Sequence, residues 1–221
     1  MNSDEFLDTY WSYYISIEKE FMNTFQYISL DEDNNNSFSQ SYAKLIMEIC
    51  SEIDVLFKEY CRFLDEKFNK RYSKIVRYRE CIRNKKPEFV DQEVQLIRND
   101  IIIVPWNEWD DADSPSWWTV YNKVKHHRTS IVKINNIGKE AYKFANQEYT
   151  LLSLAGLYQL LIYYYYDISV CENKRVVVPL PGSRMFRLVG GIWKDVIFYG
   201  DYATYINDEG YLIREWSNIY Y

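Results

Sequence analysis

Residues 114–128 contain the side chains of this chain that are best suited to chemistry: both of its histidines, two adjacent tryptophans, one asparagine and several basic residues. Ser114 followed by Pro115 predicts a helix N-terminus, with Ser114 as the N-cap, and we expect this helix to continue to about Ile131. Asn122 and His126 are four residues apart and would lie one turn apart on the helix. Histidine exchanges a proton near neutral pH, so this pair beside basic residues suits proton transfer next to a polyanion such as RNA.

The other side of the same helix is apolar. At about 100° per residue, one stripe contains Trp117, Val120, Val124 and Ile131. This stripe should anchor the helix in a core and present a polar face, on which the asparagine and histidine are flanked by Tyr121, Lys125 and Thr129. A solvated helix face rich in lysine and arginine has the same pattern without any chemistry, so both interpretations remain open.

Residues 121–128, Tyr-Asn-Lys-Val-Lys-His-His-Arg, together with the preceding Trp117-Trp118, resemble the signature helix of HEPN-like bacterial proteins. These are all-helical domains found in phage-defence and toxin–antitoxin systems. Ribonuclease members carry an arginine, then a polar residue that is often asparagine, then a histidine. By this resemblance Asn122 matches the polar position and His126 the catalytic histidine, while Tyr121 stands where the family has its arginine. Residues 51–58 and 149–166 resemble the flanking helices, so the resemblance covers roughly residues 1–170.

The resemblance implies a mainly α fold, a HEPN-like up-and-down helical bundle, and a metal-independent RNA endonuclease without a cofactor. His126 would act as acid–base and Asn122 would orient it or the substrate, and the RNA phosphates would be bound by Lys123, Lys125, Arg128 and Tyr121. The family also implies a homodimer in which two signature helices face each other, and an antitoxin or nucleotidyltransferase as a further partner. The alternative is a non-catalytic HEPN-like module that binds RNA or protein, which the tyrosine in place of arginine favours.

The net charge of −6 is distributed unevenly along the chain. The first 67 residues carry fourteen acidic and five basic side chains, whereas residues 68–150 carry eleven acidic and fifteen basic ones. Basic residues concentrate in residues 70–86, where Tyr72 and Tyr78 lie among cations that include Lys74, Arg77 and Arg79. This run predicts either an RNA footprint, with phosphates on the cations and bases on the tyrosines, or a solvated helix that pairs with the acidic N-terminal third.

Several classes of protein lack support in the sequence. The chain has no phosphate-binding glycine loop, no dinucleotide fingerprint and no Gly-x-Ser-x-Gly elbow. Its four cysteines form no Cys-x-x-Cys pair, so we expect free thiols in a reducing compartment, with Cys50 and Cys61 in the core. The acidic cluster at residues 108–113 lacks the spacing of an EF-hand, and we expect it to serve the helix N-terminus that follows, with no metal. The acidic N-terminus is unlike a secretory signal, which favours the cytoplasm.

The remaining pattern divides the chain into a helical part, residues 1–170, and a short β-rich appendage packed on it, residues 171–221. We expect helices over residues 4–25, 39–68 and 88–98, an aromatic and acidic loop over 101–115, and an apolar helix from about 149 to 167. The last of these lacks charge, but its polar residues and four consecutive tyrosines favour a buried helix over a membrane span. The final fifty residues predict a small hairpin or meander, with an extended segment over residues 175–182, strands near residues 196–199, 202–206 and 211–213, and a turn at 207–210.

Overall fold

A computed structural model describes residues 1–174, 178–193, 196, 202–206 and 212–216 of the chain. These residues are mainly helical and carry small antiparallel sheets, as the sequence predicts. The helices are α1 (Ser3–Phe6), α2 (Ser12–Asn23), α3 (Gln40–Leu64), α4 (Ile75–Lys85), α5 (Ser116–His127) and α6 (Gln147–Cys171). The strands are β1 (Glu93–Leu96), β2 (Ile102–Ile103), β3 (Ile131–Ile134), β4 (Ile137–Glu140), β5 (Phe186–Val189), β6 (Tyr202–Ile206) and β7 (Leu212–Trp216).

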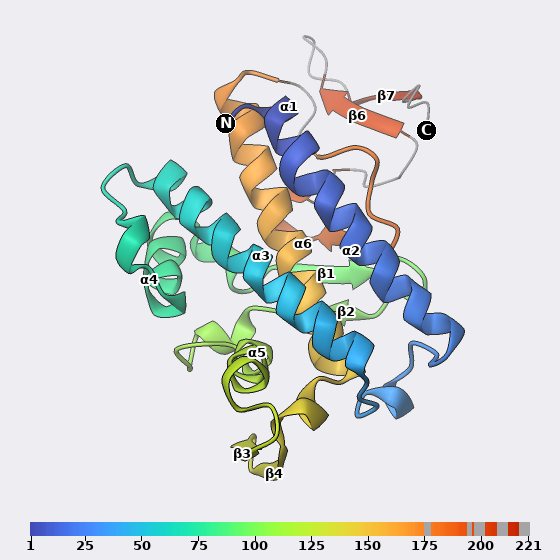
Figure 1. The fold of residues 1–221 in the computed structure, drawn as a ribbon. Helices are drawn as coiled ribbons and strands as arrows, with labels where there is room; N and C mark the ends of the chain where they lie inside the picture. The colour runs from blue at the N-terminus through green and yellow to red at the C-terminus, as the bar shows by residue number, and fades with distance from the viewer. Residues whose placement is uncertain (175–177, 194–195, 197–201, 207–211, 217–221) are drawn as a thin grey trace.

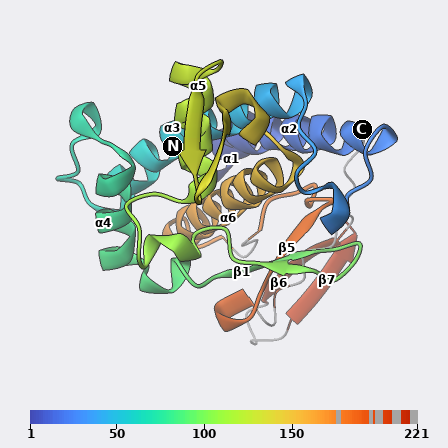
Figure 2. The ribbon, with the colours of Figure 1, turned by 90° about the horizontal axis from the view of Figure 1, so that it is seen from below.

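Helix α6 runs through the middle of the fold, with α1, α2, α3 and α5 packed against it (Figures 1 and 2). Most of its side chains are buried, on every side of the helix, which confirms the predicted buried helix. Asn146 caps it by accepting a hydrogen bond from the Tyr149 N–H at 3.0 Å. Among the described residues, no helix is long and apolar enough to cross a bilayer.

Helix α3 is the main partner of α6 and matches the prediction for residues 39–68 except at its end. Ser39 caps its N-terminus by accepting from the Tyr42 N–H at 3.0 Å. Its inner side is the apolar stripe that helical periodicity predicts, and these side chains are buried except for the half-buried Leu64: Tyr42, Leu45, Ile46, Ile49, Ile53, Leu56, Phe57 and Leu64. Cys50 and Cys61 lie in the core as free thiols, as expected. The helix ends at Leu64, and the basic run continues in the separate helix α4.

The N-terminal helix predicted over residues 4–25 is confirmed, with one irregularity. The backbone is helical from Ser3 to Asn23, and a π-helical turn at Leu7–Trp11 separates α1 from α2. Such a turn carries one extra residue relative to an α-helix and therefore changes which side chains face the core. Phe6, Trp11 and Tyr14 on either side of it are all buried.

The helix predicted over residues 88–98 is wrong. Glu93-Val94-Gln95-Leu96 alternates between less buried and buried side chains, which is the period of a strand. This strand, β1, pairs antiparallel with β2 on one side and with β5 on the other. Since β5 comes from residues 186–189, the C-terminal part of the chain completes a sheet with the helical part.

A second hairpin, formed by β3 and β4, was not predicted at all. Asn135 and Asn136 connect the strands with φ of 46° and 65°, in the left-handed region that asparagine tolerates best among non-glycine residues. The hairpin begins where helix α5 was expected to continue, so that expectation was wrong. Near the C-terminus, β6 and β7 pair as predicted, whereas residues 175–177, 197–199 and 207–211 of the expected strands and turn lie outside the described residues.

A buried carboxylate fastens the start of β5 to helix α2. Glu18 accepts hydrogen bonds from the Tyr14 hydroxyl at 2.8 Å, from the Arg184 N–H at 3.0 Å and from the Ser183 hydroxyl. Seven residues before Glu18, on the π-helical turn, the Trp11 indole N–H donates to the Pro181 carbonyl at 2.8 Å. Glu18 therefore satisfies polar groups that burial would otherwise leave without partners.

Replacing Glu18 with alanine should destabilise the fold by about 3 kcal/mol or more, because several buried donors lose their acceptor and each costs about 1–3 kcal/mol. Urea unfolding measures the change. Glu20→Ala is the matched control on the same helix, since the exposed Glu20–Lys44 ion pair should contribute about 1 kcal/mol or less. Equal losses in the two variants would contradict the role given to Glu18.

Candidate nucleic-acid interface

Helix α5 begins one residue later than predicted, and its cap comes from a distant side chain. Pro115 occupies the N-cap position, so the prediction of Ser114 as N-cap was wrong. The Glu108 carboxylate accepts hydrogen bonds from the Ser116 N–H and, at 2.8 Å, from the Ser116 hydroxyl. A carboxylate at this end is favourable because the N-terminus of a helix carries partial positive charge.

A cluster of aromatic rings holds the inner face of α5. The Trp117 indole N–H donates to the Pro105 carbonyl at 2.9 Å, and its ring packs edge-on against Trp106 with centroids 4.8 Å apart. Val120 and Val124 are buried on the same face, as predicted. Ile131 is 80% exposed on β3, so its predicted place on this stripe was wrong.

The outer face of α5 carries the pair that the sequence singled out. Asn122 and His126 are both exposed, on successive turns of the helix, and neither side chain has a hydrogen bond to another described residue. Tyr121 was expected beside them but is buried against Trp118, with ring centroids 5.2 Å apart. Its hydroxyl accepts a hydrogen bond from the Lys125 ammonium at 3.1 Å, so Lys125 covers the tyrosine from the solvent side.

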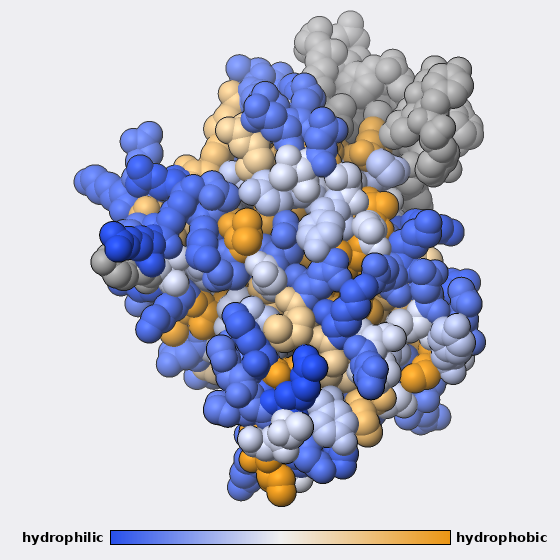
Figure 3. Space-filling model, in the orientation of Figure 1, coloured by the Kyte–Doolittle hydropathy of each residue, from blue (hydrophilic) through white to orange (hydrophobic). Residues whose placement is uncertain are grey.

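Residues 116–146 form a projecting part that we call the basic lobe, made of α5, the β3–β4 hairpin and the 3-10 turn Ala141–Phe144. It carries six lysines and arginines, both histidines and a single acidic residue, Glu140. Lys143 pairs with Glu140 at 2.8 Å. Within the described residues, the other five cations have no carboxylate partner: Lys123, Lys125, Arg128, Lys133 and Lys139. Figure 3 shows hydrophobic atoms at the tip of this lobe, where the exposed isoleucines of the hairpin lie.

Most cations of the basic run on and around α4, in contrast, have carboxylate partners. Arg77 pairs with Glu80 at 3.2 Å and Arg79 with Asp113 at 3.1 Å. Carboxylates also pair with Lys70, Arg83 and Lys86. Tyr78 is buried and stacked on Phe57, with centroids 5.2 Å apart, so the prediction that it stacks on bases was wrong. Lys74 has no carboxylate partner among the described residues.

The acidic loop before α5 ties this helix to α4. Glu108 caps α5, Asp110 pairs with Arg83 at 3.2 Å, and Asp113 pairs with Arg79. Within the acidic loop, Glu108 therefore caps the N-terminus of α5, whereas Asp113 forms an ion pair with Arg79. In the described ranges, no group of histidine, cysteine and acidic side chains is arranged to hold a metal ion.

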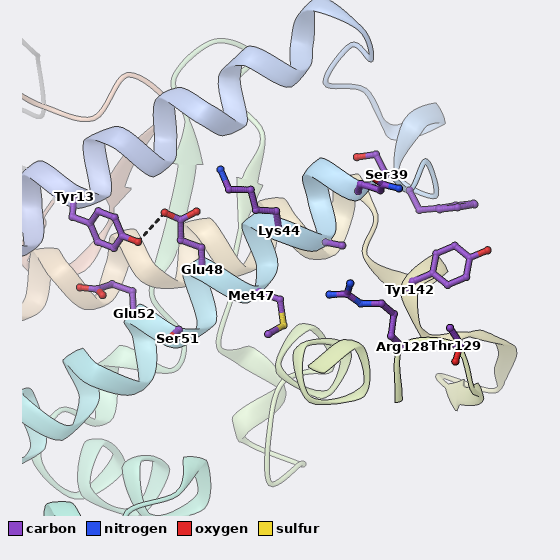
Figure 4. A pocket seen from close by; sticks show the side chains of 13 residues that line it. Tyr13, Ser39, Lys44, Met47, Glu48, Ser51, Glu52, Arg128, Thr129 and Tyr142 are labelled. Atoms are coloured by element: carbon purple, nitrogen blue, oxygen red, sulfur yellow. Dashed lines mark hydrogen bonds between the residues drawn. The ribbon is translucent and has the colours of Figure 1, made fainter. Parts of the chain in front are cut away.

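A groove of about 1210 Å³ lies where the basic lobe meets α3, and we call it the α3 groove. Its floor is a stripe of α3 that includes Ala43 and Met47. At one end are Arg128, Tyr142 and Phe38; at the other are Glu48, Glu52 and Tyr13. Figure 4 shows the arginine and Tyr142 on one side of Met47 and the two glutamates with Tyr13 on the other. The groove is thus cationic and aromatic at one end and acidic at the other.

Two carboxylates lie close together at the acidic end of the groove. Burial raises the pKa of Glu52, and the neighbouring Glu48 carboxylate, one turn away, raises it further. The Tyr13 hydroxyl donates to Glu48 at 2.8 Å, and this bond raises the pKa of Tyr13 to about 12. Within the described residues, no cation pairs with either glutamate. Lys44, which pairs with Glu20 and also lies near Glu48, brings one positive charge to this side, so the two glutamates leave this end of the groove net negative.

Backbone hydrogen bonds hold the two segments that carry the aromatic rings of the groove, Tyr142 and Phe38. The Tyr142 N–H donates to the Arg128 carbonyl at 3.0 Å, and the Ala141 N–H donates to the Ser130 carbonyl at 3.0 Å. Phe38 forms an isolated β-bridge with Asn146. Phe38 and Tyr142 are therefore fixed at the mouth of the groove by their main chains. Sequence analysis singled out neither ring.

Comparison with protein-family models, with curated proteins and with solved structures finds no match for this chain.

The Glu52→Gln variant should be more stable than the wild type at pH 7. Because the pKa of Glu52 is raised on folding, ionisation of its carboxylate opposes folding as pH rises from the unfolded pKa, about 4.3, through the folded value. Thermal unfolding at several pH values should show a gain at pH 7 that disappears below about pH 4. Glu59→Gln, on the same helix, is the control: it removes the ion pair with Lys70 and should not increase stability. If Glu52→Gln increased stability equally at all pH values, the raised pKa of Glu52 would not be the cause.

Proposed function

We propose that this protein binds RNA through the basic lobe. The observation that carries the proposal is the difference between two basic surfaces: within the part of the chain that the structure describes, most cations around α4 have carboxylate partners, whereas five of the six in the basic lobe have none. Exposed like charges repel one another and oppose folding modestly, so a surface of this kind is best explained by an anionic partner. RNA phosphates supply that charge, and binding would release their counterions.

Each cation has a suitable place for this role. Arg128 follows the last turn of α5 and offers a planar guanidinium that can bind a phosphate with two hydrogen bonds. Lys123, on α5, and Lys133, on β3, flank it along the chain and offer point charges. Asn122 and His126 add hydrogen-bonding groups on the exposed face of the same helix. Phosphate contacts from several elements would fix the orientation of the strand.

The family resemblance supports the same surface. In HEPN-like ribonucleases the signature helix acts on RNA, and the corresponding helix here is α5. We therefore infer a HEPN-like helical domain in a bacterial defence or toxin–antitoxin setting. Tyr121, at the arginine position of the motif, is buried, and its hydroxyl is bonded to the Lys125 ammonium. This difference favours the non-catalytic, RNA-binding form of the family.

Metal-independent RNA cleavage is the second candidate function. The observation that favours it is the exposure of Asn122 and His126 on successive turns, where both can reach one substrate. The histidine would move a proton at the attacking 2′-hydroxyl or the leaving oxygen, as a general acid–base must. Lys125 would then supply the charge that the family takes from arginine, as a point charge in place of a bidentate group.

Substituting Lys123, Arg128 and Lys133 together by glutamine should weaken RNA binding and flatten its salt dependence. Each lost phosphate contact on a single strand lowers the slope of log Kd against log salt by about 0.7, so the slope should fall by about 2. Fluorescence anisotropy with a labelled RNA at several salt concentrations measures it. The triple variant Lys74→Gln, Arg77→Gln, Arg79→Gln has the same change in charge, and a slope that falls more in this control would place the footprint on α4.

For the second candidate, cleavage of RNA in EDTA should be lost in His126→Ala and kept in His127→Ala. Both histidines are exposed at the end of α5, so both variants should keep the melting temperature of the wild type. Gel analysis of RNA after incubation with each purified protein is the measurement. Absence of cleavage by the wild type would leave RNA binding as the function; equal cleavage by all three proteins would exclude His126 as the acid–base.

A further inference from the structure

Beyond phosphate binding, the mouth of the α3 groove has the features of a site for an unpaired base. Two aromatic side chains, Phe38 and Tyr142, lie there with centroids 5.7 Å apart and planes at 72°. They are 45% and 36% exposed, which is unusual in a chain whose aromatic side chains are mostly buried. Exposed rings fixed by their main chains are a common platform for bases, since every base has a face that stacks.

The cation needed beside such a platform is Arg128. Arg128 lines the same groove as both rings. Its backbone carbonyl accepts a hydrogen bond from the Tyr142 N–H, so the guanidinium and the Tyr142 ring extend from two main-chain segments that are hydrogen-bonded to each other. Within the described residues its guanidinium has no carboxylate partner. A nucleotide with its phosphate on Arg128 would therefore have its base within reach of the rings.

The other end of the groove restricts what can enter. Glu48 and Glu52 form no salt bridge among the described residues, and the nearby Lys44 ammonium pairs with Glu20, so this end stays net negative and disfavours a phosphate. A nucleic-acid backbone is therefore confined to the arginine end, while the neutral base can extend over Ala43 and Met47. Duplex RNA keeps its bases stacked inside the helix and cannot place one in such a groove without unpairing it.

We propose that the α3 groove binds one unpaired base of a single-stranded RNA, stacked on one of the two rings, Phe38 or Tyr142, and packed against the other, while Arg128 holds the adjoining phosphate. This inference rests on the proposed RNA binding by the basic lobe and deepens it, because it names the substrate class as single-stranded RNA. It also assigns two specificity-determining residues that lie outside α5.

The test compares a labelled single-stranded RNA with a duplex of the same length, by fluorescence anisotropy at one salt concentration. Loss of one stacking contact lowers affinity by roughly 5- to 150-fold, so Phe38→Leu and Tyr142→Leu should each weaken single-strand binding by at least about 5-fold and leave duplex binding unchanged. Leucine keeps an apolar side chain, and thermal melting checks that each variant folds. Tyr27→Leu is the control, because Tyr27 is 87% exposed and does not line this groove.

A fluorescent base analogue in the single strand gives a second readout. Stacking on an aromatic ring should quench 2-aminopurine when the wild type binds, and Tyr142→Leu should remove the quenching. Equal affinity of the wild type for single strand and duplex, or ring variants with unchanged single-strand affinity, would overturn the base site while RNA binding stands. Binding of neither RNA by the wild type would overturn the proposed function itself, and the base site with it.

Discussion

The arrangement of this protein depends on the need to bury one helix on all sides. Helix α6 is apolar around its whole circumference, and such a helix is stable only when other elements cover it. Gly156 on α6 lets a large ring approach: the Trp106 indole N–H donates to the Gly156 carbonyl at 3.3 Å, and a Cβ at this glycine would lie 3.3 Å from the ring. Trp106 in turn packs on Trp117 of α5. The burial of α6 thereby fixes the helix that carries the candidate site.

The same constraint explains why α5 can present an undisturbed polar face. Its inner side is held by tryptophans and valines and its start by Glu108, so none of the exposed side chains is required for folding. Asn122, His126 and Arg128 are free for a ligand in this sense. The cations of α4 are in the opposite situation, because ion pairs with the acidic loop and with neighbouring helices use them to join elements. Composition alone makes the two surfaces look alike.

Those parts of the structure that rest on long, regular patterns could be predicted from the sequence. The inner stripe of α3 and the anchoring of α5 by Trp117, Val120 and Val124 follow from helical periodicity, and the buried helix α6 follows from a long run without charged residues. The wrong predictions lie where the secondary structure depends on a few residues only. Glu93–Leu96 alternates over only four residues, and the Asn135-Asn136 turn between β-branched residues is a hairpin signal that the helix prediction ignored. The long-range ion pairs of Arg79, Arg83 and Lys86, and the meeting of Phe38 with Tyr142, depend on tertiary structure and leave no trace in local spacing.

The central claim is that RNA lies on the basic lobe. Ultraviolet cross-linking of a bound RNA, followed by mass spectrometry of the cross-linked peptides, tests it most directly because it locates the contact without altering the protein. The account predicts cross-links within residues 122–142 and at Phe38. Cross-links confined to residues 70–86 would contradict it, since the footprint would then lie on the cations that the structure pairs with carboxylates.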